Sequence, residues 1–306
     1  MELHIEEKYQ PIKKLCKMFG NTKQAYYQRI AYTYQEQVKG EILFQEVKKH
    51  RKDMPRIGGR KLQYLINKEL PEEFHIGRDK FFKWLRDNNL LIKKRRVRIF
   101  TTNSHHWLHK YPDLIKDYVV TAPNQLWVSD ITYIKTEEGV MYLFLLTDAY
   151  SKKILGWKLS DNLGADNAVE TLKMALRQWK DVGYKLIHHS DRGVQYCSAK
   201  YVKLLKKKGI EISMTQDGNP LDNAIAERIN GILKDEWLYD IKITTKEQAL
   251  IEIRKIIKTY NNKRPHLSLG MRTPQCVHQD IIPNEMPKKM WKNYYSEERS
   301  ECEAKE

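Results

Sequence analysis

Several features that mark other protein classes are absent from this sequence or scarce in it. No apolar run approaches the ~20 residues that a membrane-spanning helix needs, and the N-terminal stretch MELHIEEKYQ lacks the hydrophobic region of a signal peptide. Only four cysteines are present, and no two are close in the chain. Scattered thiols are typical of a reducing compartment. We therefore expect a cytoplasmic protein with free cysteines at Cys16, Cys197, Cys276 and Cys302.

Zinc sites built from cysteine and histidine pairs are missing too. His105 and His109 are four residues apart, but no C-x-x-C pair completes a four-ligand set. Internal repeats are also absent, which leaves an ordinary globular organisation. At 306 residues, with 41% hydrophobic residues, the chain is long enough for two or three packed domains.

Positive charge is abundant and uneven. The formal net charge is +16, and residues 1–120 hold 26 Lys and Arg against 14 Asp and Glu. The rest of the chain holds 29 against 25. A basic front part joined to a nearly balanced part indicates a polyanion-binding region that serves a catalytic core. A solvated basic surface would produce the same charge distribution.

Residues 11–31 are predicted to form two short helices around a turn at Gly20, with Asn21 or Thr22 capping the second helix. This pattern is typical of a helix-turn-helix over residues 1–35, although an ordinary helical hairpin shares it. If the second helix reads DNA, its exposed polar side chains are the expected contacts: Lys23, Gln24, Gln28 and Arg29.

Residues 36–98 are predicted to form a basic helical DNA-binding region, with helices at 38–52, 58–70 and 78–89. The stretch KKRRVR then places five basic residues within six. It is expected to be an arm that contacts phosphates, although a solvated linker would have the same sequence pattern. Residues 99–123 follow as a linker. The expected DNA contacts of this region are Arg60, Lys61, Lys93, Lys94, Arg95 and Arg96.

From residue 125 the hydrophobic period changes to that of strands. Three hairpin-linked strands followed by alternating helices and strands predict an α/β fold with a mixed sheet and helices on its faces. We place this core at 124–285 and a disordered tail at 286–306. The expected strands are 126–134, 140–150, 153–160, 185–191 and 210–215, and the expected helices are 165–181, 198–208 and 222–238.

Three acidic residues stand in these apolar elements: Asp130, Asp191 and Glu227. A lone carboxylate is costly to bury, so three carboxylates from three elements indicate a cluster that binds a cation. Ligation by Asp and Glu alone favours Mg²⁺ or Mn²⁺, and we expect two ions. Lys234 shares a helix stripe with Glu227 and Gly231, where it can hold a phosphate. The alternative is that each acid is an unrelated cap or turn residue.

Other polar residues compete for roles at this site. Asp148 ends the second strand, as a fourth ligand or as a turn residue that accepts backbone hydrogen bonds. His189 has the strand parity of Asp191, as a site neighbour or a packed histidine. Asp235 and Glu236 are expected to face solvent. Arg264 is a candidate phosphate contact, and a structural role is equally open.

Four ordered motifs carry a family resemblance: PNQLWVSDITYI, HSDRGVQY, GNPLDNAIAERINGILKDE and YNNKRPHLSLGMRTP. Together they resemble the DDE transposases of bacterial insertion sequences, most closely the orfB product of insertion-sequence family three. The resemblance extends over nearly the whole chain. The chain departs from the family pattern at Arg228 and Ile229, and in GMRTP.

The resemblance implies a retroviral-integrase-like core with an RNase H-like fold. Asp130, Asp191 and Glu227 match the family's catalytic triad, and Lys234 matches its basic residue after the glutamate. It further implies Mg²⁺-dependent strand cleavage at element ends and strand transfer into target DNA. Double-stranded DNA, further copies of the chain and an upstream-frame fusion partner are the implied partners, in association with a bacterial nucleoid. Two alternatives stay open: a domesticated DNA-binding protein without catalysis, and an RNase H-like nuclease.

Overall fold

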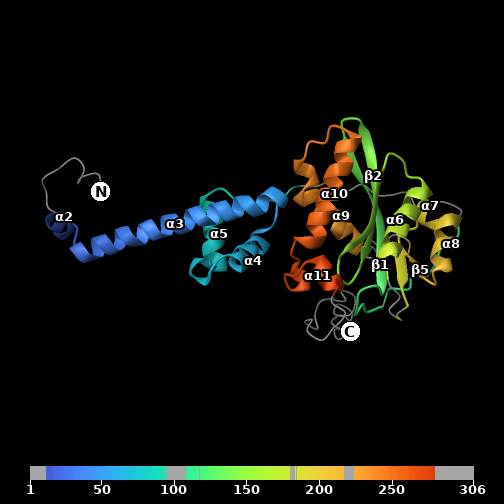
Figure 1. The fold of residues 1–306 in the computed structure, drawn as a ribbon, viewed down its shortest axis with the longest axis horizontal. Coiled ribbons are helices and arrows are strands. Elements are labelled where there is room, and N and C mark those ends of the chain that lie inside the picture. The colour runs from blue at the N-terminus through green and yellow to red at the C-terminus, as the bar shows by residue number, and fades with distance from the viewer. Residues whose placement is uncertain are drawn as a thin grey trace, which may run out of the picture. The chain divides into compact units, whose positions relative to one another are not determined.

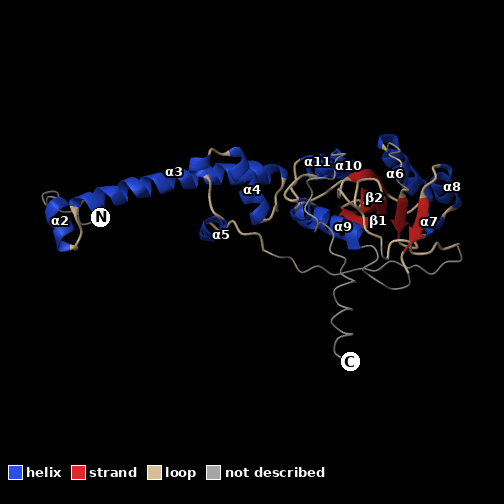
Figure 2. Ribbon diagram, turned by 90° about the horizontal axis from the view of Figure 1, so that it is seen from below, coloured by secondary structure: helices blue, strands red, loops and turns tan. Residues whose placement is uncertain are grey.

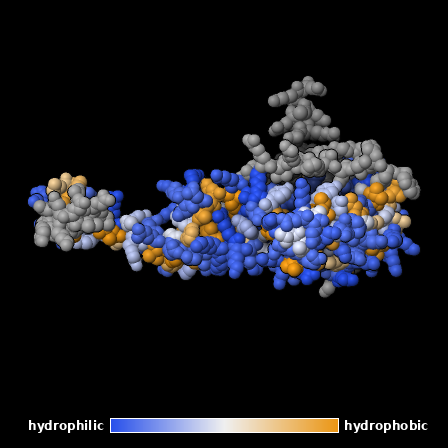
Figure 3. Space-filling view, turned by 90° about the horizontal axis from the view of Figure 1, so that it is seen from above, coloured by the Kyte–Doolittle hydropathy of each residue, from blue (hydrophilic) through white to orange (hydrophobic). Residues whose placement is uncertain are grey.

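A computed structural model of the chain describes residues 12–93, 95, 108–116, 118–179, 183, 185–216 and 224–279. The chain divides into two compact units (Figure 1). The first contains Met1–Asp53 and Leu62–Leu90, and the second contains Met54–Lys61 and Leu91–Glu306. The face seen in Figure 3 is largely hydrophilic, with apolar residues in scattered patches. Within the described ranges, no helix combines the length and the apolar character that crossing a membrane requires.

The N-terminal helices begin as the sequence predicts. A turn follows the first helix at Gly20, whose φ of 67° lies in the left-handed region that glycine adopts most readily. Thr22 then caps the next helix, because its Oγ1 accepts a hydrogen bond from the backbone N–H of Ala25 at 3.0 Å. The helices of this part are α2 (Ile12–Met18), α3 (Lys23–Asp53), α4 (Gly59–Glu69), η1 (Glu72–Phe74) and α5 (Arg78–Asp87).

The second helix is much longer than predicted. We expected it to end near residue 31 and a separate helix to span 38–52, but α3 runs unbroken for 31 residues. It also passes through residue 35, where we placed a domain boundary. No proline interrupts the segment, and a helical Gly40 costs only about 1 kcal/mol relative to alanine. Trp84 of α5 lies against Gly40, and the buried residues of α3 (Leu43, Val47 and His50) all belong to its second half.

The region from residue 124 onward forms the predicted mixed sheet. Its five strands follow the order β3-β2-β1-β4-β5, with β1, β2 and β3 antiparallel and β1, β4 and β5 parallel. The strands are β1 (Leu126–Thr136), β2 (Gly139–Asp148), β3 (Ile154–Ser160), β4 (Ile187–Ser190) and β5 (Glu211–Met214). The helices are α6 (Ala165–Gln178), α7 (Val194–Cys197), α8 (Ala199–Lys207), α9 (Ala224–Glu236), η2 (Leu238–Asp240), α10 (Lys246–Asn262), η3 (Leu267–Leu269) and α11 (Pro274–Gln279).

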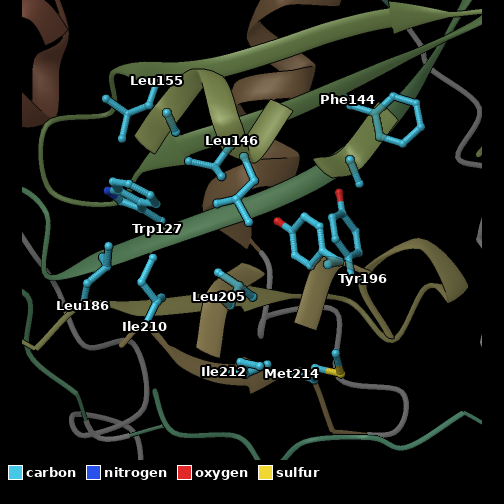
Figure 4. Packing of buried hydrophobic residues seen from close by; sticks show 14 of the residues in the cluster. Trp127, Phe144, Leu146, Leu155, Leu186, Tyr196, Leu205, Ile210, Ile212 and Met214 are labelled. Atoms are coloured by element: carbon cyan, nitrogen blue, oxygen red, sulfur yellow. The ribbon is translucent and has the colours of Figure 1, made fainter. Parts of the chain in front are cut away.

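Helices cover both faces of this sheet, so it forms the middle of three layers (Figure 2). One face packs against α6 and α8 through a large apolar cluster that includes Trp127, Leu146 and Leu205 (Figure 4). On the other face, a smaller apolar cluster packs Val128 of β1 against Ala226 of α9. Because side chains alternate along a strand, successive residues of β1 and β4 face different helices.

The contact between β3 and α6 is close enough to require glycine. A Cβ added at Gly156 would overlap the carbonyl oxygen of Thr171 and would lie 3.1 Å from its carbonyl carbon. Both atoms belong to the helix backbone, which cannot rotate away as a side chain does.

We expect Gly156→Ala to lower the free energy of unfolding by about 2 kcal/mol, because α6 must shift off the sheet. Urea unfolding followed by circular dichroism measures this loss. Gly231→Ala is the matched control, since nothing lies within 4 Å of a Cβ added there. It should be neutral or stabilise α9 by up to about 1 kcal/mol. Equal effects of the two substitutions would contradict the close approach.

Candidate active site

Parallel pairing of β1 with β4 brings the first two acids together. The register pairs Ser129 with Ser190, so the next residue on each strand is Asp130 and Asp191. Their parity matches that of Val128 and His189, which places both carboxylates on the face of the sheet that α9 covers. This register brings the first two of the three predicted acids to neighbouring positions on adjacent strands.

The surroundings of Asp130 oppose its negative charge. Loss of water around the carboxylate is the main cause, and the charge of Asp191 adds to it, so the pKa of Asp130 rises to about 7. Hydrogen bonds from the Ile131 backbone and the Asn230 side chain act in the other direction. Glu227 also raises the pKa of Asp130, by a smaller amount. Three negative groups therefore share this region of the sheet.

Helix α9 carries the third acid over the two strands. Glu227 lies in its first turn, with its side chain open to solvent, and partial desolvation raises its pKa. The three carboxylates are near enough to interact electrostatically, but their oxygens do not all lie within 4.8 Å of one another. Lys234 lies two turns further along, and the charge of Asp130 partly offsets the desolvation that lowers the lysine pKa. The acids and the lysine predicted from the sequence are thus neighbours.

Asn230 is a member of this site that the sequence did not reveal to us. Its Nδ2 donates a 2.6 Å hydrogen bond to Oδ2 of Asp130, and the residue is only 5% exposed. The bond joins α9 to the middle of β1. A signal was available, since a polar residue interrupts the buried helix face formed by Ile229 and Leu233.

The turn after β4 holds Asp191 in place. Oδ1 of Asp191 accepts a 3.0 Å hydrogen bond from the backbone N–H of Gly193. A Cβ at Gly193 would come 3.0 Å from this same oxygen, so glycine lets the backbone approach the carboxylate closely. The turn leads directly into α7, which begins at Val194.

A buried polar cluster supports the two strands from the opposite face. The hydroxyl oxygens of Ser129 and Tyr201 both lie 2.8 Å from Nε2 of His188. Burial lowers the pKa of His188 to about 3, so its imidazole is neutral at physiological pH. These bonds tie β1, β4 and α8 together directly beneath the carboxylates.

Two further candidate site residues make contacts that give them structural roles. His189 is fully buried on the carboxylate face, and its Nδ1 lies 2.8 Å from Oγ of Ser213 on β5. Asp148 is also fully buried and accepts hydrogen bonds from the backbone N–H groups of Ser151 and Asn124, both at 2.7 Å. It pairs in register with Trp127, three residues before Asp130. These contacts agree with the turn-residue alternative for Asp148.

Arg264, Lys61 and Glu236 form one cluster, so the prediction that Glu236 faces solvent is wrong and Arg264 has the structural role that the sequence left open. Arg264 is 2% exposed, and its Nε and Nη2 donate to the two carboxylate oxygens of Glu236 at 2.7 and 2.6 Å. Lys61 donates to the same carboxylate at 3.1 Å. Glu236 therefore does not face solvent, because two cations neutralise its charge below the surface. Neither Arg264 nor Lys61 presents a free charge to phosphate.

The segment YNNKRPHLSLG, whose role the sequence left open, holds the C-terminal part of the core together. The side-chain amide of Asn261 donates to the carbonyl of Ile154 at 2.9 Å and accepts from its N–H at 3.0 Å. Asn261 thereby supplies the two hydrogen bonds that a neighbouring strand would make at the start of β3. Arg264 then secures the end of α9 through Glu236, as described above.

The remaining DNA-contact candidates divide into three groups. Arg95 forms an ion pair with Asp240, which leaves it 29% exposed. Lys94 and Arg96 lie outside the described residues. The others have exposed side chains, and contact with DNA stays a prediction for them: Lys23, Gln24, Gln28, Arg29, Arg60 and Lys93.

Comparison with known proteins places this arrangement in a family. Two models of the integrase core domain match residues 120–220 and 208–274. The chain is 34% identical over 270 residues to an uncharacterized 31 kDa protein of insertion element IS600 from Shigella sonnei, which covers 87% of this chain and 97% of the relative. The chain belongs to the insertion-sequence transposase family, with an integrase-like core.

Other relatives of this transposase align over a smaller share of their length. It is 39% identical over 168 residues to the transposase for insertion sequence element IS904 from Lactococcus lactis, covering 54% of this chain and 65% of the relative. It is 36% identical over 163 residues to transposase InsF for insertion sequence IS3fB from Escherichia coli, covering 53% and 56%. Among solved structures, the HTLV-2 integrase catalytic core domain in complex with magnesium has a TM-score of 0.40 at 19% identity, covering 52% of this chain and 97% of that domain.

We expect the metal-free transposase to lose stability as pH rises from 5 to 8. The folded protein keeps a proton on Asp130 up to about pH 7, whereas the unfolded chain releases it near pH 4. Between these values the unfolded state therefore becomes steadily more favourable. Urea unfolding in the presence of EDTA at several pH values measures this effect. Over this range, the free energy of unfolding of the wild type should fall by about 2 kcal/mol relative to that of Asp130→Asn. Parallel curves for the two proteins would contradict the raised pKa.

We expect Arg264→Met to lower the free energy of unfolding by about 3 kcal/mol, because it leaves the buried Glu236 carboxylate with Lys61 alone. Arg254→Met removes an exposed arginine of the neighbouring helix α10 and should cost less than about 0.5 kcal/mol. Adding Glu236→Gln to Arg264→Met should recover part of the loss. If both single arginine substitutions cost the same, the ion pair does not stabilise the core.

Proposed function

We propose that this transposase cuts DNA strands at the ends of an insertion sequence and joins them to target DNA, using Asp130, Asp191 and Glu227. The observation that carries the proposal is the crowding of negative charge around Asp130, whose pKa is raised by burial, by Asp191 and by Glu227. Such crowding is unfavourable for a purely structural site. It is favourable where a cation is to be bound.

The donor set suits a hard divalent cation. Asp130, Asp191 and Glu227 offer oxygen atoms alone, which is the ligand chemistry of Mg²⁺ and Mn²⁺. They would hold the cation, and we infer two ions because phosphodiester chemistry needs both the attacking and the leaving oxygen stabilised. When bound, the metal supplies Lewis-acid stabilisation of negative charge on these oxygens.

The other residues of the site act by positioning and charge. Asn230 holds the Asp130 carboxylate through its 2.6 Å bond, so that one oxygen keeps a fixed direction. Lys234 supplies positive charge near Asp130, where a backbone phosphate of the substrate would otherwise be repelled. Gly231, between Glu227 and Lys234 on α9, has open space where a side chain would be. A polymer can therefore approach this part of the helix.

The expected binding partners follow from the proposed strand cleavage and strand transfer. The substrate is double-stranded DNA, both the element ends and the target, and the exposed basic residues of α2 and α3 are inferred to bind it. Joining two ends in one reaction requires more than one copy of the chain, so we infer a homo-multimer on DNA at the bacterial nucleoid. An upstream-frame fusion partner would add further DNA-binding surface.

The test uses the full chain, Mg²⁺ or Mn²⁺, and a labelled duplex that carries the DNA flanking the coding sequence. We expect strand transfer into a plasmid, and a loss of at least about 100-fold in Asp191→Asn and Glu227→Gln, because each removes a charged ligand. Asp235→Asn is the matched control, since Asp235 is an exposed acid on the same helix as Glu227. It should leave the rate unchanged.

Three outcomes would overturn the proposal. Binding of the duplex without cleavage would favour a domesticated DNA-binding protein. Degradation of an RNA–DNA hybrid without strand transfer would favour an RNase H-like nuclease. Strand transfer that survives Asp191→Asn would exclude the three acids as the catalytic residues. If activity appears only after fusion to the upstream frame, the same variants test the fusion protein.

A further inference from the structure

A second group of potential metal ligands lies in the N-terminal helical unit. The proposed DNA cleavage and strand transfer do not use these ligands. Glu46 and His50 are four residues apart on α3, so they share one helix face. Glu69 is the last residue of α4. One ligand atom from each of the three lies within 4.8 Å of the other two.

The distances are close to those that a bound ion would impose. Nε2 of His50 lies 3.9 Å from Oε2 of Glu46 and 3.7 Å from Oε1 of Glu69. Tetrahedral ligands at zinc–ligand distances are about 3.4 Å apart. The two distances from His50 exceed this separation by only a few tenths of an ångström, so small side-chain movements would bring the imidazole and each carboxylate to bonding positions.

His50 provides an independent indication of a ligand. It is only 8% exposed, and its Nε2 makes no hydrogen bond to any residue that the structure describes. A buried polar nitrogen left unpaired costs about 1–3 kcal/mol. An unprotonated imidazole nitrogen can offer a lone pair to a metal. An oxygen of Glu46 and an oxygen of Glu69 both lie within 4.0 Å of this nitrogen.

Lys49 is the competitor for this position. Its Nζ donates to Glu46 at 3.0 Å and to Glu69 at 2.6 Å. An ammonium group is a donor only, so it pairs with the two carboxylates and not as a ligand of a metal. The lysine side chain is 57% exposed, so it can turn into solvent when another cation arrives.

We propose that Glu46, His50 and Glu69 form a binding site for a divalent transition-metal ion, with Zn²⁺ as the best match. One imidazole and two carboxylates suit Zn²⁺ better than Mg²⁺, which prefers oxygen ligands and retains its water. Three protein ligands leave a fourth position for water. The ion would join the second half of α3 to the end of α4, and it would displace Lys49.

The experiment uses the full chain carrying Asp191→Asn, stripped with EDTA, with excess Mg²⁺ to fill any site made of oxygen ligands alone. Zn²⁺ is titrated by isothermal calorimetry, and Co²⁺ is added as a probe whose visible absorption reports its ligands. We expect one Zn²⁺ per chain. His50→Gln and Glu69→Gln should each weaken binding at least about 10-fold, and Glu69 is exposed enough for its variant to fold.

Lys49→Gln distinguishes the metal site from a simple ion-pair cluster. If the metal displaces the lysine, this variant should bind Zn²⁺ more tightly than the Asp191→Asn parent does, by about 3-fold or more. If the cluster exists only to pair with Lys49, the variant loses thermal stability and gains no affinity. The proposal is overturned by that result, by absence of Zn²⁺ binding, or by binding that neither His50→Gln nor Glu69→Gln weakens.

Discussion

The repulsion between carboxylates is the constraint on which the catalytic core depends. Asp130 and Asp191 follow the last paired residues of two parallel strands, and α9 adds Glu227 to the same face. Like charges at this separation favour any movement that increases it. The core must therefore hold β1, β4 and α9 rigidly enough to resist that movement when no cation is bound and Asp130 has released its proton.

Helix α9 is fixed at two points for this reason. Asn230 bonds to Asp130 near the N-terminal half of the helix, and Glu236 bonds to Arg264 at its C-terminal end. Glu227 lies in the first turn, beyond the first of these points, and it is exposed. Its carboxylate thus keeps some freedom to adjust to a ligand, whereas the helix as a whole does not.

Local patterns in the sequence predicted most of the core, and long-range pairs account for what they missed. Alternating and 3.6-residue periods located the strands and α9, and three acids in apolar elements indicated one cluster. The buried ion pair of Glu236 with Arg264 spans 28 residues, and charge alone does not show which residue a side chain will meet. The length of α3 was missed because weak helix breakers such as Gly40 are tolerated where another helix packs against them.

The two adjacent histidines of β4 also fix the alignment of the strands. Strand β4 pairs with β1 at only four positions, and slippage by one residue would turn Asp191 to the other face of the sheet. His188 bonds to hydroxyls on one side of the sheet and His189 to a hydroxyl on the other. A slipped strand would exchange the surroundings of both rings and leave buried polar atoms unmatched. The two histidines thereby determine that only one alignment presents Asp130 and Asp191 together.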